Sequence, residues 1–265
     1  TGAFAYCTKI VCGSNGYVYL ATRMVTSPDG GTLLYLGALR RSADGGATWT
    51  DITPSVTYLP NPQYAGTGLA GYSTGQIGAI SDIEISSTGR MHVVSGMMGY
   101  AQYYAYTNNP GTVTSSTGWA NAVTPFSNYS TSTAYTQRTE LAVKGDTLYA
   151  LPVRSDTRNA DTIWKSTNGG ANWSKTVGQI SNMTNGQGYY DLAVAINPLN
   201  ANECIVGGLD TWKTVDGGAT WTKISNWYGT TGQYVHADQH NIVWYDNGNK
   251  LLFASDGGVF YLSLI

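Results

Sequence analysis

Three copies of one ten-residue pattern decide the fold of this 265-residue chain. They read RSADGGATWT at 41–50, KSTNGGANWS at 165–174 and KTVDGGATWT at 213–222. Asp-Gly or Asn-Gly between two β-prone segments is a strong signal for a β-hairpin, because Asn, Asp and Gly tolerate positive φ angles. The pattern therefore predicts three hairpin turns, each followed by a strand that begins at a Trp.

The spacing of the copies predicts a repeated four-stranded unit. The distance from Asn168 to Asp216 is one unit of roughly 40–50 residues, the length of a propeller blade. The distance from Asp44 to Asn168 is longer, so a degenerate copy is expected between them. YTNNPG at 106–111, followed by Trp119, fits that place.

Alternation of apolar and polar residues predicts further strands of such units along the rest of the chain. It predicts five units of antiparallel strands, the last of them incomplete, and no segment shows a convincing helical period. The predicted units cover residues 4–52, 80–123, 139–177, 190–225 and 240–265. We therefore expect an all-β fold organised as a single domain over 1–265.

The decamer is that of the Asp-box, so the chain resembles the Asp-box (BNR-repeat) β-propeller superfamily. That superfamily includes sialidases, xyloglucanase-type glycoside hydrolases and the sortilin (Vps10) domain. The resemblance implies a β-propeller of four-stranded antiparallel blades, with about five blades of a larger propeller present here. It is closest to bacterial secreted Asp-box proteins from about residue 188 onward. It implies structural roles for the box residues Asp44, Trp49, Asn168, Trp173, Asp216 and Trp221.

Composition narrows the classes of function. Only 11% of the residues are charged and the net charge is −2, which argues against an electrostatic nucleic-acid binder. No apolar run reaches the roughly 18 residues of a membrane-spanning helix. The low charge and the many Thr and Tyr residues are typical of a secreted or cell-surface protein. Loops rich in Tyr, Ser, Gly and Asn have the composition of a binding surface. The chain ends in a strand pattern, so we expect the rest of a longer parent chain, or a partner, to cover the last sheet edge.

The three cysteines do not predict a disulfide framework. Cys7 and Cys12 lie in one strand-like segment, too far apart along an extended strand to bridge each other. With Cys204 they are expected to be small buried apolar residues.

The residues that open the first predicted strand of each unit form a candidate ring around the propeller axis. After Thr8 in the first unit, this position is acidic in the next three units, at Asp82, Glu140 and Asp191, and histidine, His240, in the fifth. Carboxylates gathered in this way are candidate catalytic groups. The alternative is that they cap backbone N–H groups at the strand ends.

Two neighbouring features extend the ring. Arg138 lies two residues before Glu140 and so on the same side of a strand. His236, Asp238 and His240 alternate, and in an extended strand all three side chains would point one way. That arrangement suits a divalent metal such as zinc, or a hydrogen-bond network in which Asp238 orients a histidine. Asp256-Gly-Gly is interpreted as a turn.

Three functions are consistent with these features. The first is a module that binds a glycan or an extracellular protein, with candidate ligand-binding residues Arg138, Tyr190, His236, Asp238, His240, Trp227 and Tyr228. The second is a glycoside hydrolase that uses two ring carboxylates. The resemblance makes it xyloglucanase-like, because the Phe/Tyr-Arg-Ile-Pro motif of sialidases is absent. The third is a structural segment of an extracellular assembly.

Overall fold

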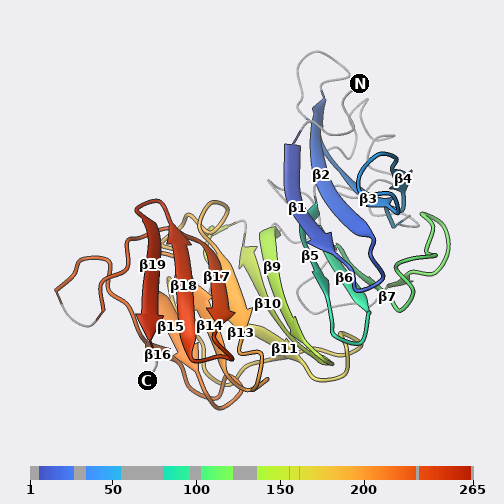
Figure 1. The fold of residues 1–265 in the computed structure, drawn as a ribbon. Coiled ribbons are helices and arrows are strands. Elements are labelled where there is room, and N and C mark those ends of the chain that lie inside the picture. Colours follow the sequence, from blue (N-terminus) through green and yellow to red (C-terminus); the bar gives the residue numbers. More distant parts are fainter. Residues whose placement is uncertain are drawn as a thin grey trace. The chain divides into compact units, whose positions relative to one another are not determined.

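The computed structural model describes residues 6–26, 34–54, 80–95, 103–121, 136–154, 156–160, 162–230 and 233–263. Every regular element in these ranges is a β-strand (Figure 1). The same ranges hold no helix with the length and hydrophobicity that a bilayer crossing demands. The all-β class predicted from the sequence is confirmed.

The described residues fall into two compact units, Thr1–Thr139 and Glu140–Ile265. The first unit contains two antiparallel sheets, each with its strands in chain order. The first sheet is β1 (Tyr6–Cys12), β2 (Val18–Thr26), β3 (Leu34–Ser42) and β4 (Thr50–Asp51). The second is β5 (Ile80–Ile85), β6 (Met91–Ser95), β7 (Tyr103–Thr107) and β8 (Ala120–Asn121).

Three more sheets follow, and the first strand of the next one, β9, crosses the boundary between the units. This sheet is β9 (Thr136–Lys144), β10 (Thr147–Arg154), β11 (Trp164–Ser166) and β12 (Ser174–Lys175). The fourth sheet is β13 (Ala193–Ile196), β14 (Cys204–Gly207), β15 (Thr211–Thr214) and β16 (Thr222–Lys223). The fifth is β17 (Gln239–Tyr245), β18 (Lys250–Ser255) and β19 (Gly258–Ser263). The five sheets occur in the order of the five predicted units, and the bounds of those units stay a prediction. Residues 4–5, 27–33, 96–102, 122–123, 155, 161 and 264–265 of the predicted units lie outside the described ranges.

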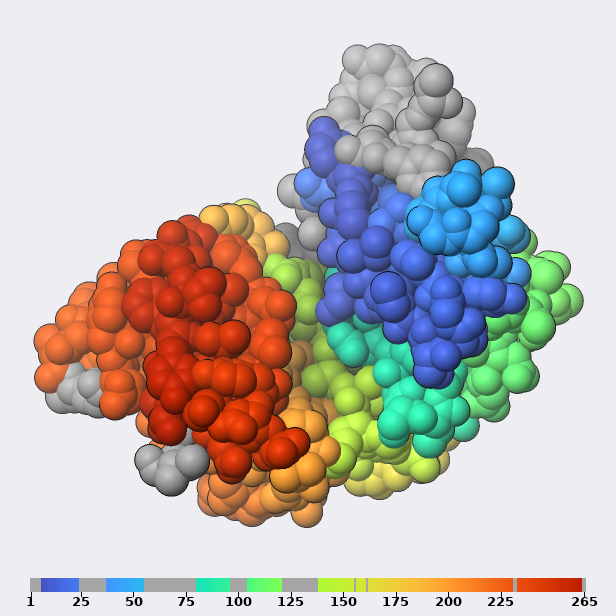
Figure 2. Space-filling view, viewed as in Figure 1, coloured from blue at the N-terminus to red at the C-terminus, as the bar shows by residue number. Residues whose placement is uncertain are grey.

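The fifth sheet ends on an exposed strand. In the other four sheets a two-residue strand follows the third strand, whereas β19 is the last described strand of its sheet. Val259 and Tyr261 of β19 are 70% and 55% exposed. The surface formed by residues of this sheet, red in Figure 2, is open to solvent on the side that faces the viewer.

Each decamer forms the predicted hairpin. Its first and last residues are register partners, as Arg41 and Thr50 are between β3 and β4. The same pairing joins β11 to β12 and β15 to β16. In the first copy, Oδ1 of Asp44 accepts hydrogen bonds from the Ser42 hydroxyl (2.7 Å) and the Thr48 N–H (2.8 Å). Gly45 and Gly46, with φ of 69° and 99°, allow the chain to reverse.

The basic residue at the head of the first two decamers connects its sheet to another one, which the hairpin interpretation did not anticipate. Arg41 of β3 donates to the backbone carbonyls of Pro110 (2.9 Å) and Val113 (3.2 Å), which follow β7. Lys165 of β11 donates to the side chain of Asn202, next to β14. The decamer therefore joins neighbouring sheets as well as closing a turn.

Apolar side chains of paired sheets form the core. One cluster joins the first two sheets and includes Tyr19, Leu39 and Ile83. The second unit has two clusters, one around Tyr149 and one around Phe253. Of the cysteines, Cys204 is buried as expected, but Cys7 and Cys12 are exposed and all three are free thiols. The burial prediction was wrong for these two because β1 is an exposed strand that alternates poorly.

The middle hairpin offers a test of the turn network. In the first and last copies, the second carboxylate oxygen of Asp44 or Asp216 accepts a hydrogen bond from the hydroxyl of Thr48 or Thr220. The Thr48 hydroxyl holds the pKa of Asp44 at about 2, and the Thr220 N–H, followed by its hydroxyl, does the same for Asp216. The middle copy has Asn168 and Asn172 at the two positions.

We expect N168D/N172T to raise Tm by about 1–2 °C, more than the two single changes together, because the carboxylate and the hydroxyl stabilise the turn only as a pair. Thermal unfolding of the four proteins of the double-mutant cycle measures this coupling. Strictly additive shifts would contradict it.

Candidate binding site

The first strand of three sheets contains a β-bulge at the same place. The register shifts between Cys7 and Lys9 in β1, between Ile80 and Asp82 in β5, and between Gln239 and Asn241 in β17. The extra residues are Thr8, Ser81 and His240. A bulge bends a strand and redirects a side chain, and bulges are common beside functional sites. The predicted alignment of Asp82 with Thr8 and His240 was wrong by one residue, because Asp82 follows its bulge.

Asp82 is a fully buried carboxylate within a polar network of the first unit. Its Oδ1 lies 2.7 Å from Nζ of Lys9 and accepts a hydrogen bond from the Ile83 N–H (2.8 Å). The Lys9 ammonium also lies 3.1 Å from Glu84. These contacts favour the alternative that Asp82 caps the strand.

The other ring residues occupy different settings. Arg138 and Glu140 both lie in β9, half-buried. Asp191 does not open a strand as predicted, because β13 begins at Ala193. It closes a turn in which its N–H donates to the carbonyl of Gln187 (3.1 Å), and its side chain is buried.

His236, Asp238 and His240 do not share one direction. Asp238 has a φ of 65°, so the segment is not extended and the alternation fails there. The three side chains therefore have different partners. No group of three or more His, Cys, Asp or Glu side chains that could hold a metal ion occurs among the described residues. His236, Asp238 and His240 therefore do not form the set of three neighbouring ligands that a divalent metal site needs.

Asp256 is a candidate site residue that the sequence analysis interpreted only as part of a turn. It lies at the tip of the β18–β19 hairpin, and pairing of Gln239 with Ser255 brings this tip beside the start of β17. Its Oδ1 lies 2.6 Å from Nε2 of His240, and the Tyr190 hydroxyl donates to both of its oxygens (3.0 and 2.9 Å). The hydrogen bond with His240, and then that with Tyr190, lower the pKa of Asp256, so it is an ionised acceptor.

The side chains around Asp256 lie close to a second hydrogen-bonded set in the same unit, and charges of the second set act on Tyr190. The amide of Gln187 donates to Asp238 and, at 3.4 Å, to Asp191. The ring of His236 covers Gly257, where a Cβ would lie 2.3 Å from the His236 Cγ. We call this group the Tyr190 cluster; its members are Gln187, Tyr190, Asp191, His236, Asp238, His240 and Asp256.

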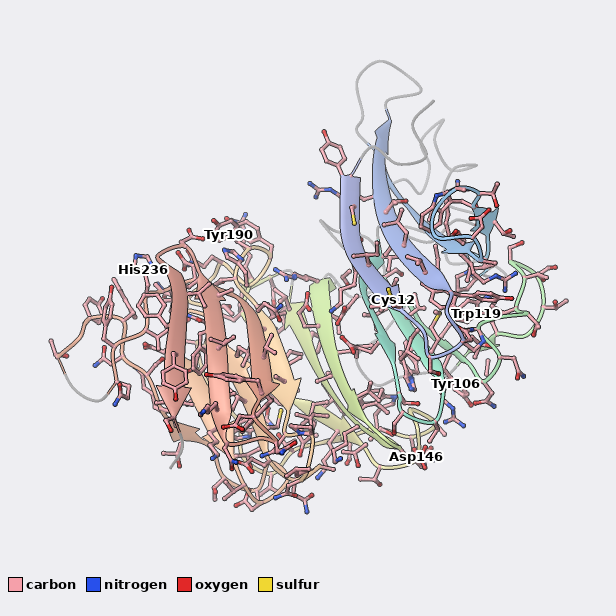
Figure 3. All side chains as sticks on the ribbon, in the orientation of Figure 1. Cys12, Tyr106, Trp119, Asp146, Tyr190 and His236 are labelled. Atoms are coloured by element: carbon pink, nitrogen blue, oxygen red, sulfur yellow. The ribbon has the colours of Figure 1, made fainter. Side chains whose placement is uncertain are left out.

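The Tyr190 cluster runs from a buried base to an exposed surface. Asp191 is fully buried, whereas Tyr190 is 46% exposed. The rings of Tyr190 and His240 meet edge to face with centroids 4.9 Å apart. Tyr190 and His236 lie at one end of the second unit, and Asp146 lies at the opposite end (Figure 3). The cluster can therefore present an aromatic ring and fixed hydrogen-bonding groups to a ligand.

Trp227 and Tyr228 lie in the loop between β16 and β17. The centroids of their rings lie 3.8 Å apart with the planes tilted by 32°, and Tyr228 is 70% exposed. The Trp227 N–H donates to Asp210 (2.8 Å), which fixes the loop backbone. Tyr234, in the same segment, packs on Phe260 of β19. This loop is therefore a second exposed aromatic surface of the unit.

Comparison with known proteins identifies the fold. No family model and no curated protein matches the chain. Among solved structures, the chain is similar to an ancestral GH74 enzyme (TM-score 0.56, 15% identity), covering 96% of this chain and 28% of that one. It is similar to the α-L-arabinanase of Penicillium chrysogenum complexed with arabinobiose (TM-score 0.55, 13% identity), covering 96% and 74%.

A structure of YCF48 bound to a D1 peptide is also similar (TM-score 0.49, 16% identity), covering 92% of this chain. The chain spans 64% of the length of that protein and about a quarter of the GH74 enzyme. The matches to the GH74 enzyme and the arabinanase, together with the successive four-stranded antiparallel sheets, show that the chain has a β-propeller fold.

Proposed function

We propose that this chain is an extracellular Asp-box β-propeller module that binds a glycan through the Tyr190 cluster. The observation that carries the proposal is the half-exposed ring of Tyr190, whose hydroxyl is fixed by an ionised carboxylate, Asp256. An aromatic face with a few fixed polar groups is the usual composition of a small-molecule site. Sugars offer both an apolar ring face and hydroxyl groups, so they suit such a surface.

The polar members of the cluster match the chemistry of sugar hydroxyls. A carboxylate accepts hydrogen bonds only, and an amide both donates and accepts. Asp256 and Asp238 supply the first kind of group, and Gln187 supplies the second. Because Gln187 already holds Asp238, little side-chain freedom is lost on binding, which favours affinity.

The Asp-box assignment is supported by the turns themselves. Three decamers share one hydrogen-bond network around Asp44, Asn168 or Asp216. An Asp-box protein of bacterial, secreted origin is the relative that we propose, with a glycan as its partner.

A glycoside hydrolase is the second candidate. The observation in its favour is that one amide, that of Gln187, bridges two carboxylates, Asp191 and Asp238. Paired carboxylates perform acid–base hydrolysis of glycosidic bonds. The same incubations that measure binding separate this outcome, because hydrolysis releases reducing ends.

The test is a glycan array followed by calorimetry on the protein and three variants. We expect Y190A and D256N to weaken binding by about 10-fold or more, because each removes a hydrogen bond that involves a charged group. D246N is the matched control, since Asp246 pairs with Lys250 at the other end of β17. Binding that survives both Y190A and D256N unchanged would contradict the proposal. Release of reducing ends that D238N abolishes would establish the hydrolase.

A further inference from the structure

The Tyr190 cluster holds three carboxylates between its buried base and its exposed surface. Asp191, Asp238 and Asp256 are its three carboxylates, and Asp256 is 38% exposed at its side chain. The hydrogen bond with Asp256, together with the charges of all three, raises the pKa of Tyr190. All three carboxylates therefore act on the hydroxyl that a ligand would meet.

The cations of the second unit contact partners that lie outside the cluster. Arg154 pairs with Asp156, and Arg158 lies over the ring of Tyr189. Each lysine also has its own partner. These pairs are Lys144 with the Pro198 carbonyl, Lys165 with Asn202, Lys175 with the Trp164 ring, Lys213 with Glu203, Lys223 with Asp210, and Lys250 with Asp246.

The carboxylates of the Tyr190 cluster determine which glycans can bind there. A hydroxyl group of a neutral sugar can donate a hydrogen bond to a carboxylate of the cluster. A carboxylate on the sugar would instead be repelled by the like charge of the cluster, and partial burial strengthens this repulsion. Recognition of an anionic sugar would demand an Arg or Lys facing it. We infer that the Tyr190 cluster selects uncharged glycans and rejects glycans that carry uronic or sialic acids. This inference rests on the proposed function.

The experiment uses one neutral glycan that the wild-type chain binds and three matched forms of it. One form is untreated, one has its primary hydroxyls oxidised to carboxylates, and one has those carboxylates methylated. Binding is measured at pH 8, where histidine is ordinarily neutral. We expect the oxidised form to bind at least about 10-fold more weakly, and methylation to restore most of the affinity because it removes the charge.

Variants locate the source of the repulsion. D256N lowers affinity for the neutral form, so the measured quantity is the ratio between the neutral and oxidised forms. We expect D256N to reduce this ratio and D246N to leave it at the wild-type value. Raising the salt to about 1 M, where the Debye length is about 3 Å, should also reduce it.

The outcomes separate the two claims. If no glycan binds, the proposed function fails. If a neutral glycan binds and its oxidised form binds equally well, the selection fails while the function stands. Equal effects of D256N and D246N on the ratio would also overturn the selection, because the charge would then not act from the cluster.

Discussion

Lowering the pH from 6.5 to 4 should destabilise this protein by about 3 kcal/mol through one side chain, His92. His92 is fully buried in β6, where Nδ1 lies 2.8 Å from the Tyr104 hydroxyl and Nε2 has no hydrogen-bond partner among the described residues. Burial, followed by the charge of Arg90, lowers the pKa of His92 to about 3. A protonated ring would place two donors where the fold supplies one hydroxyl.

The sign of this pH effect on stability follows from the number of protons that the folded and unfolded states bind. In the folded chain His92 stays neutral down to about pH 3, whereas in the unfolded chain it takes up a proton near pH 6.5. The unfolded state therefore binds more protons in this window, and stability is complete above pH 6.5 and is lost as the pH falls. Asp44 and Asp216, with pKa values of about 2, lose their contribution only below about pH 3.8.

Urea unfolding at a series of pH values between 7 and 4 measures the effect. H92Q keeps a partner for Tyr104 and should flatten the pH dependence across this window. A steep slope that persists in H92Q would show that another group is responsible.

The features of the fold that the sequence predicted correctly depend on contacts between residues that are close together in the chain. Asp44-Gly45-Gly46 closes a tight turn through bonds within five residues, so its hairpin is confirmed wherever the decamer occurs. The role of Arg41 was missed because its acceptors, Pro110 and Val113, lie in the next sheet and carry no pattern of their own.

The candidate site was predicted less well, for two physical reasons. Alternation along a strand assumes regular pairing, and the bulges at Ser81 and His240 break it without a signal in the residues themselves. The left-handed conformation of Asp238 has the same effect on the His236–His240 segment. Asp256 was interpreted as a turn, which it is. Its position beside His240 follows only from the antiparallel pairing of β17 and β18. That pairing was itself predicted and could have been used to place Asp256 next to His240.

Replacement of Lys9 by Met should cost about 3 kcal/mol of stability, at the lower end of what removal of one partner from a buried ion pair costs. The Asp82 carboxylate is fully buried 2.7 Å from the Lys9 ammonium, and the Lys9 side chain is 32% exposed, so solvent screens part of the interaction. Met retains most of the apolar part of the Lys9 side chain. The loss of stability in K9M therefore measures the contribution of the Lys9 charge. Chemical denaturation at pH 7 measures it.

The double variant K9M/D82N decides between the two roles of Asp82. Asn at position 82 is neutral and still accepts the Ile83 N–H, so it should recover most of the stability lost in K9M. If Asp82 only caps the strand and balances Lys9, the folded double variant binds the same glycan as the wild type. A folded double variant that has lost binding or hydrolysis would instead place Asp82 in the functional site, as the ring of carboxylates predicts.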